Sequence, residues 1–243
     1  MAHRSLFPLL VPLLLTSTVA TAPPGSSPAP SGSGPDDVPL VKRVLAARQE
    51  YQASLEALRE HYLRTNDLER TRWVEDELLS YHRISKRPYR LDLDVPPPNL
   101  QPMHNIPEAN DLFRRAMAYK GKGWLAEHDD NMRRAEILFQ QLLAQYPQSD
   151  KIADVAYQLG EIYESRAFKQ YRRAAAYFER HFQWNPRSNN DARLRAARIY
   201  DKVLLDRGRA TQLYREVMTH DTDQKRVDEA RKRLLELAGG SAN

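Results

Sequence analysis

The sequence predicts an all-α protein made of an N-terminal helical hairpin, an α-solenoid of about three helix-pair repeats and a C-terminal capping helix. From residue 41 onward, apolar side chains recur every three or four residues, which is the spacing of a helix that buries one face. A pattern of alanine, aromatic and proline residues repeats in the C-terminal half, with copies 39 and 36 residues apart. The third copy is weaker, because Thr222 stands where the proline should be. From residue 41 onward, all eight prolines lie between the helical stretches, where they end helices and mark boundaries.

Composition limits the class of protein. A chain of 243 residues permits one or two domains, and 41% hydrophobic with 28% charged residues is ordinary for a soluble protein. The net charge of +5 is the difference between 37 cationic and 32 anionic side chains, so we expect a mixed surface and no nucleic-acid partner. The lack of cysteine in the sequence excludes disulfides, thiolate zinc sites and lipid attachment through cysteine.

Residues 1–22 predict a cleaved signal peptide, and hence export to the periplasm or out of the cell. An apolar run from Leu6 to Leu15 precedes Ala20 to Ala22, which has the small-x-small cleavage pattern. The run has about half of the ~20 residues that a spanning helix needs. The alternative is an uncleaved N-terminal anchor. Residues 23–39 are rich in proline, serine and glycine, and they predict a disordered tether.

Residues 40–85 predict a helical hairpin. The apolar spacing places one helix from Val41 to Leu63 and a second from about Leu68 to Arg83. Between them, Asn66 suits a left-handed C-cap and Asp67 suits an N-cap. The same spacing also fits an oligomerising coiled coil, although a parallel coil would prefer no break at Asn66.

Residues 86–107 predict a proline-rich linker and a domain boundary. Six prolines lie between Pro88 and Pro107, too many for a helix. Within this stretch, Arg90 to Asp94 alternates between polar and apolar residues. We therefore expect a short strand, or an extended segment packed on a neighbour.

Residues 108–240 predict the repeat domain. In its clearest repeat, the small residues Gly160 and Ala174 let two antiparallel helices approach closely, and Pro186 ends the second helix. In a first copy, Gly121, Gly123 and Trp124 lie near the small and aromatic positions, although the register is poor. A last amphipathic helix, residues 227–237, would cover the final apolar face of the array. The residues assigned a structural role in the repeats are Ala135, Phe139, Pro147, Leu159, Gly160, Tyr163, Ala174, Phe178, Pro186, Ala210 and Tyr214.

The order L-G-x-x-Y, then A-x-x-x-F, then P around Gly160 resembles the tetratricopeptide repeat (TPR) signature. The run from Phe139 to Tyr163 is similar to repeats of bacterial outer-membrane assembly proteins and of the Tol-Pal-associated cell-division coordinator. The resemblance covers residues 106–237 and implies a fold that binds peptides or protein surfaces without catalysis. The chain departs from these families in two ways. It lacks the cysteine through which the assembly proteins are lipid-anchored, and its break at Asn66 argues against the continuous trimeric coil of the coordinator.

The sequence predicts no catalytic constellation, no cofactor and no metal site. The histidines are dispersed without a metal-ligand spacing, and no glycine loop is suited to phosphate. Glu127 to Asp130 is the densest polar cluster, and we interpret it as an acidic turn before a helix with Asp130 near the N-cap, rather than a cation site. A hydrolase or metal-dependent enzyme with a site near His128 is the least favoured alternative.

The resemblance implies that the first helix of each repeat lines a concave groove. Its middle would be acidic with an aromatic residue, which suits a basic or amphipathic peptide. The alternative is an ordinary solvated helix face. The residues expected in this partner-binding groove are Asp154, Tyr157, Glu161, Glu164, Leu194 and Arg198.

Arginines directly precede the repeat alanines, at Arg134, Arg173 and Arg209. Cations at a helix start oppose the helix dipole, so their recurrence needs an explanation. One hypothesis is a basic edge that faces an anionic envelope surface. The other is pairing with carboxylates of the adjacent repeat.

Together these patterns predict a non-catalytic, exported scaffold or adaptor. It would bind a protein or peptide partner through the TPR groove, in assembly or maintenance of the cell envelope. The first alternative is a structural oligomer built through residues 40–85, and the oligomeric state is left open. The second alternative is the enzyme hypothesis above.

Overall fold

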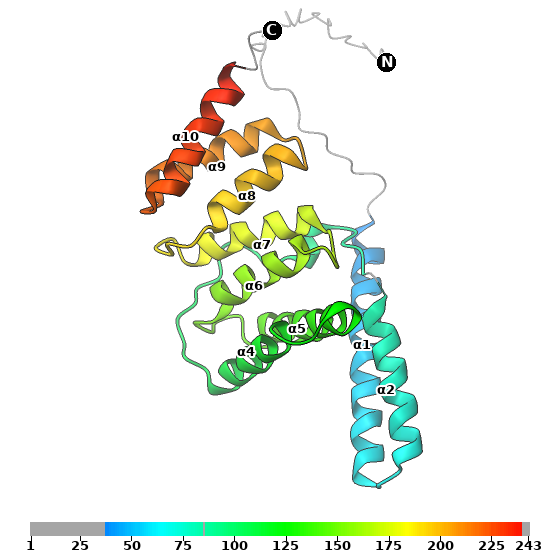
Figure 1. Ribbon diagram of the computed structural model, residues 1–243. Coiled ribbons are helices and arrows are strands. Elements are labelled where there is room, and N and C mark those ends of the chain that lie inside the picture. The colour runs from blue at the N-terminus through cyan, green and yellow to red at the C-terminus, as the bar shows by residue number, and fades with distance from the viewer. Residues whose placement is uncertain (1–36, 85, 240–243) are drawn as a thin grey trace, which may run out of the picture. The chain divides into compact units, whose positions relative to one another are not determined.

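The part of the chain that the structure describes is mainly helical. This computed structural model describes residues 37–84 and 86–239, which contain ten helices and no β-strand (Figure 1). The all-α prediction is confirmed for these residues. The predicted signal peptide and residues 23–36 of the predicted tether lie outside them. None of the described helices is long and apolar enough to cross a membrane.

Two helices, α1 (Val38–Arg64) and α2 (Leu68–Arg83), lie side by side at the start of the described chain (Figure 1). The turn between them is set by local chemistry. Asn66 has a φ of 54°, and the Asp67 side chain accepts a hydrogen bond from the Arg70 amide at 3.1 Å. Asp67 is the N-cap of α2, as predicted, whereas the C-cap of α1 is Thr65 and the left-handed Asn66 follows it.

The seam between α1 and α2 has a small apolar centre. Leu55, Val74 and Leu78 are buried in it, and Tyr62 packs against them. The two helices therefore bury little apolar surface between themselves. Large apolar side chains stay exposed on both helices, and they are Leu40, Val44, Tyr51, Leu58, Leu63, Leu68 and Trp73.

Helices that are neighbours in the chain pack against each other from α4 to α10, and α2 also contacts α5. Prolines help to set the ends of several helices. Pro107 is the first residue of α4, and Pro147 and Pro186 each lie two residues beyond the end of a helix. The bounds are α4 (Pro107–Lys120), α5 (Leu125–Gln145), α6 (Ile152–Glu164), α7 (Tyr171–Trp184), α8 (Ala192–Lys202), α9 (Arg207–His220) and α10 (Gln224–Gly239).

The turns inside successive helix pairs share one backbone conformation. Lys169 and Leu205 have φ values of 50° and 57°, and each directly precedes the N-cap of the next helix. The amide of that N-cap residue then donates to the carbonyl of a tyrosine near the end of the preceding helix, at 2.8 Å and 2.9 Å. The turn at Asn66 repeats this arrangement. A recurring turn of this kind gives consecutive pairs similar geometry.

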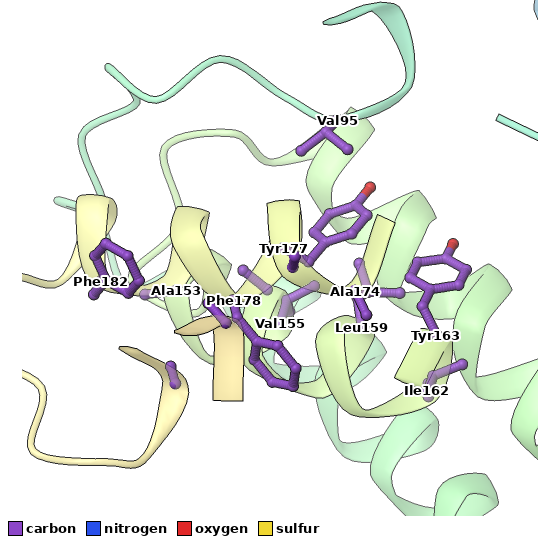
Figure 2. Packing of buried hydrophobic residues seen from close by; sticks show 14 of the residues in the cluster. Val95, Ala153, Val155, Leu159, Ile162, Tyr163, Ala174, Tyr177, Phe178 and Phe182 are labelled. Carbon is purple, nitrogen blue, oxygen red and sulfur yellow. The ribbon is translucent and has the colours of Figure 1, made fainter. Parts of the chain in front are cut away.

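The alanine and aromatic positions of the pattern lie in the core. Figure 2 shows Ala174 and Phe178 of α7 facing Leu159 and neighbouring residues of α6. A Cβ atom added at Gly160 would lie 2.6 Å from the Phe178 ring, so only glycine fits at this crossing. Six positions of the pattern are fully buried, and they are Ala135, Ala174, Ala210, Phe139, Phe178 and Tyr214.

The proline-rich segment is not a strand. Leu91–Asp94 forms one helical turn, α3, which stops at Val95 because the residue before a proline favours extended backbone. The strand prediction for Arg90 to Asp94 is therefore wrong. The turn is closed by the Val95 amide, which donates to the Leu91 carbonyl at 2.9 Å.

Residues 94–97, which we call the strap, lie against α7. Val95 is 4% exposed and joins the core, where Figure 2 shows it near Tyr177. The Arg180 Nε donates to the Pro96 carbonyl at 2.6 Å, and the Trp184 Nε1 donates to the Pro97 carbonyl at 3.1 Å. This part of the predicted linker is thus seated on the helices that follow it.

The first copy of the pattern departs from the predicted register. Trp124 is 86% exposed, so it does not fill a seam between helices. It directly precedes α5, and Gly123 before it has a φ of 86°. The aromatic position assigned to Trp124 is wrong, because the turn lies where the repeat would need a helix.

Candidate binding surface

Ion pairs join the first helices of successive pairs. Lys120 of α4 lies 2.5 Å from the Glu161 carboxylate of α6, and Arg195 of α8 lies 2.6 Å from Glu161 and 2.7 Å from Glu164. Arg198 of α8 continues the series by pairing with α10. The members of this set, which we call the first-helix ladder, are Lys120, Glu161, Glu164, Arg195, Arg198 and Glu229.

The structure separates the six predicted groove residues into two groups. Asp154 is exposed, and Glu161, Glu164 and Arg198 belong to the first-helix ladder. Leu194, by contrast, is 1% exposed and part of the apolar core. Its assignment to an open groove is wrong, because this position of α8 faces the neighbouring helices.

Tyr157 is half-buried at the edge of the ladder. Its ring packs edge-on against Phe178 and His181, with centroids 5.8 Å and 5.5 Å away, and its hydroxyl donates to Asp191 Oδ1 at 2.7 Å. Burial, and then the hydrogen bond to Asp191, raises the pKa of Tyr157 to about 12. The phenol is therefore a neutral donor that bridges α6 and the start of α8.

The carboxylates of the ladder are already neutralised by cations. Burial opposes ionisation of Glu161, yet the hydrogen bonds from Lys120 and Arg195 lower its pKa overall. Glu164 shares the guanidinium of Arg195 through Nε at 2.9 Å. The predicted acidic groove is thus a surface of alternating charge, on which a basic partner would compete with Arg195.

The three repeated arginines do not form an exposed basic edge. Arg209 of α9 pairs with Glu179 of α7 at 2.5 Å. Arg173 is buried, with its Nε 2.5 Å from Asp94 Oδ2. Only Arg134 is exposed, with its guanidinium over the Tyr119 ring. The basic-edge hypothesis is wrong for Arg173 and Arg209, because carboxylates of neighbouring segments neutralise them.

Arg173 is the centre of a buried polar cluster. Glu136 Oε1 lies 3.7 Å from its Nη1, and the Tyr163 ring centroid lies 4.1 Å from its Cζ. Glu136 also accepts a hydrogen bond from the Tyr163 hydroxyl at 2.6 Å. Burial raises the pKa of Asp94, against the opposing charge of Arg173. The cluster therefore ties the strap to α5 and α7.

Sequence analysis missed Asp94 and Glu136. Glu136 carried a usable signal, because it lies four residues after Met132 and three before Phe139, on the apolar face of α5. A carboxylate on such a face needs a buried partner. For Asp94 the sequence carries no comparable signal, because its partner Arg173 lies 79 residues further along the chain.

The polar cluster from Glu127 to Asp130 lies within α5, so its interpretation as a turn before the helix is wrong. Asp130 pairs with Arg83 of α2 at 2.7 Å, which explains its position better than an N-cap does. Among the described residues, no group of histidine, aspartate and glutamate side chains is arranged to hold a metal ion. No family model, no curated protein and no solved structure matches this chain.

Proposed function

We propose that this chain is an exported, non-catalytic scaffold that binds a protein or peptide partner through a groove formed by TPR-like helix pairs. The role would lie in assembly or maintenance of a cell envelope. One observation carries the proposal. The alanine and aromatic positions of three successive pairs are fully buried at matching places in α5, α7 and α9. Repetition of these buried positions is the pattern of a stacked array, in which the outer faces of the first helices can form one continuous surface.

The charges of the first-helix ladder indicate which kind of partner could bind there. Glu161 and Glu164 share one guanidinium, that of Arg195, and Asp154 lies exposed about two to three turns earlier on α6. A basic or amphipathic peptide would replace Arg195 at these carboxylates and stack on the exposed edge of Tyr157. Export rests on the sequence of residues 1–22.

Site-specific photo-crosslinking in cells tests this role. A photoreactive amino acid at Asp154, on the ladder side of α6, should yield one adduct of discrete mass. The matched control places the same amino acid at Arg172, which is exposed at the start of α7. Equal adducts from Asp154 and Arg172, or no adduct from Asp154, would contradict a partner in the groove.

A structural oligomer built through α1 and α2 is the second candidate, favoured by the exposed apolar residues on both helices. The buried centre of this pair consists of three residues, whereas Val44, Tyr51 and Leu58 remain more than a third exposed. Light scattering of the full chain gives the mass directly. A mass that halves in a Val44→Lys, Leu58→Lys variant supports the oligomer, and a monomer at all concentrations excludes it.

A further inference from the structure

A cleft of about 460 Å³ lies between α1 and α5, with Asp94 of the strap and Arg173 of α7 among its lining residues. This volume is within the ~300–1,000 Å³ that small-ligand sites occupy in proteins. We call it the α1–α5 cleft. It is distinct from the first-helix ladder, which is built from α4, α6, α8 and α10.

Hydrogen bonds and ion pairs hold the polar base of the cleft in place. Asp94 Oδ2 lies 2.5 Å from Arg173 Nε, and Asp94 Oδ1 accepts from Arg173 Nη2 at 2.9 Å. Gln140 Nε2 donates to the hydroxyls of Tyr163 and Tyr177 at 2.9 Å and 2.8 Å. These groups are committed to one another, so the base is preorganised and Arg173 is already neutralised.

Two other cations of the cleft have no carboxylate partner among the described residues. The Lys86 ammonium donates to the Tyr81 carbonyl at 3.2 Å and lies 4.2 Å from the centroid of the Tyr81 ring. The Arg48 guanidinium lies 5.4 Å from the centroid of the Tyr89 ring. Neither forms an ion pair within the described chain. Aromatic rings hold both cations in position without neutralising them.

The field around Lys86 favours an added negative charge. Burial is the main cause that lowers the pKa of Lys86. The charge of Glu136 has the largest effect among the neighbouring charges and raises the pKa, whereas the charges of Arg133, Arg48 and Arg173 lower it. A carboxylate beside Lys86 would relieve this repulsion.

The walls of the cleft favour a peptide over a simple anion. Gln49 and Gln52 of α1 stand on one wall, and Gln141 and Gln145 of α5 stand on the other. A carboxamide both donates and accepts hydrogen bonds, as a peptide group does. Within the walls, Gln52 Nε2 donates to Glu56 Oε1 at 2.9 Å and Gln141 Nε2 donates to Gln145 Oε1 at 3.4 Å. The amide oxygens of Gln49, Gln52 and Gln141 accept no hydrogen bond within the described chain, and a phosphate or sulfate ion, which has no donor to offer them, would leave them so.

We propose that the α1–α5 cleft binds a short acidic peptide segment, whose carboxylate lies between Arg48 and Lys86 and whose backbone pairs with the facing glutamines. This goes beyond the groove function proposed above, because it assigns a second site with the opposite charge preference. The acidic ligand could not use the ladder carboxylates.

The test uses the full chain labelled with ¹⁵N and two capped tripeptides, acetyl-Ala-Glu-Ala-amide and its glutamine counterpart. We expect millimolar glutamate peptide to shift the amide signals of cleft residues, with the glutamine peptide about tenfold weaker because it lacks the charge-assisted hydrogen bonds. Arg48→Gln and Lys86→Gln should each weaken binding about tenfold. Arg43→Gln, exposed on the same helix outside the cleft, should leave it unchanged.

Three outcomes would overturn the assignment. The first is equal binding of the glutamate and glutamine peptides, and the second is the absence of signal shifts at the cleft at millimolar peptide. The third is binding of acetate as tight as that of the glutamate tripeptide, which would mean that the cleft recognises a simple carboxylate and not a peptide. Because photo-crosslinking at Asp154 reports on the other surface, failure here leaves the proposed function standing.

Discussion

Gly160 and Phe178 together set how closely α6 approaches α7. A methyl group at Gly160 would lie 2.6 Å from the ring of Phe178, which is itself fully buried and cannot withdraw. Gly160→Ala should therefore lower the free energy of unfolding by about 1–3 kcal/mol, the usual range for overpacking a core. Urea denaturation monitored by circular dichroism measures this change.

Gly208 provides the matched control. It lies in the first turn of α9, and an added Cβ would meet only Asp206 Oδ1, at 3.6 Å. Gly208→Ala should leave stability unchanged or raise it by up to about 1 kcal/mol, since alanine is the better helix former. Equal stability of the two variants would show that the α6–α7 crossing is wider than described.

His82 of α2 gives a prediction about pH. Its Nε2 is buried without a hydrogen-bond partner, and burial, followed by the charges of Lys86 and Arg134, lowers its pKa to about 4. In the unfolded chain the imidazole has its ordinary pKa of about 6.5. Between pH 6.5 and 4 the unfolded state therefore binds a proton that the folded state does not bind. Acidification from pH 6.5 to 4 should therefore reduce stability.

The His82 effect is measured in two ways. Its imidazole signals in NMR should titrate with a midpoint near 4. The difference in unfolding free energy between wild type and His82→Gln should change across the interval from pH 6.5 to 4 and be flat above it. A midpoint near 6.5 would mean that water reaches the ring freely.

At the scale of elements, the strap depends on side-chain donors of α7. Trp184→Phe keeps a six-membered aromatic ring but removes the five-membered ring and its N–H, which donates to the Pro97 carbonyl. Because Trp184 is buried, the variant should cost more than the ~0.5–1.5 kcal/mol of the hydrogen bond alone. Trypsin should then cleave faster after Arg90, which precedes α3. Trp73→Phe is the control, because Trp73 is an exposed residue of α2. Unchanged cleavage in Trp184→Phe would show that the strap is held by other contacts.

Elements with local signals were predictable from sequence, and the strap was not. Asn66 and Asp67 fix the α1–α2 turn through bonds that span a few residues. Asp94 instead finds Arg173 at a separation of 79 residues, which no local pattern encodes. Leu194 was misplaced for a related reason, because its burial depends on how the neighbouring helices cross. At the candidate surface, the sequence predicted which positions carry charged side chains, but it did not predict which of them form ion pairs with one another.

At the scale of the whole molecule, packing that is mainly between chain neighbours predicts uneven stability. Each helix from α4 to α10 contacts mainly its neighbours in the chain, so damage near one end should stay local. Leu213 of α9 is fully buried, and Leu213→Ala should cost about 2–5 kcal/mol. Native-state hydrogen exchange should then accelerate in α8 to α10, while α4 to α7 keep their protection.

Leu159→Ala is the comparison at the centre of the array. Leu159 is fully buried in α6, which has packed neighbours on both sides, so its loss should accelerate exchange in all helices from α4 to α10. Identical exchange patterns in the two variants would show a single cooperative unit instead.

The strap offers α7 only main-chain oxygens at three of its contacts, the carbonyls of Asp94, Pro96 and Pro97. Every residue type supplies a carbonyl, so mutation can alter most strap side chains without touching these bonds. The donors Tyr177, Arg180 and Trp184 have no such freedom. In homologous proteins, the prolines of the strap should therefore vary more than Tyr177, Arg180 and Trp184. These three donors would identify homologues even where the sequence of the strap has changed.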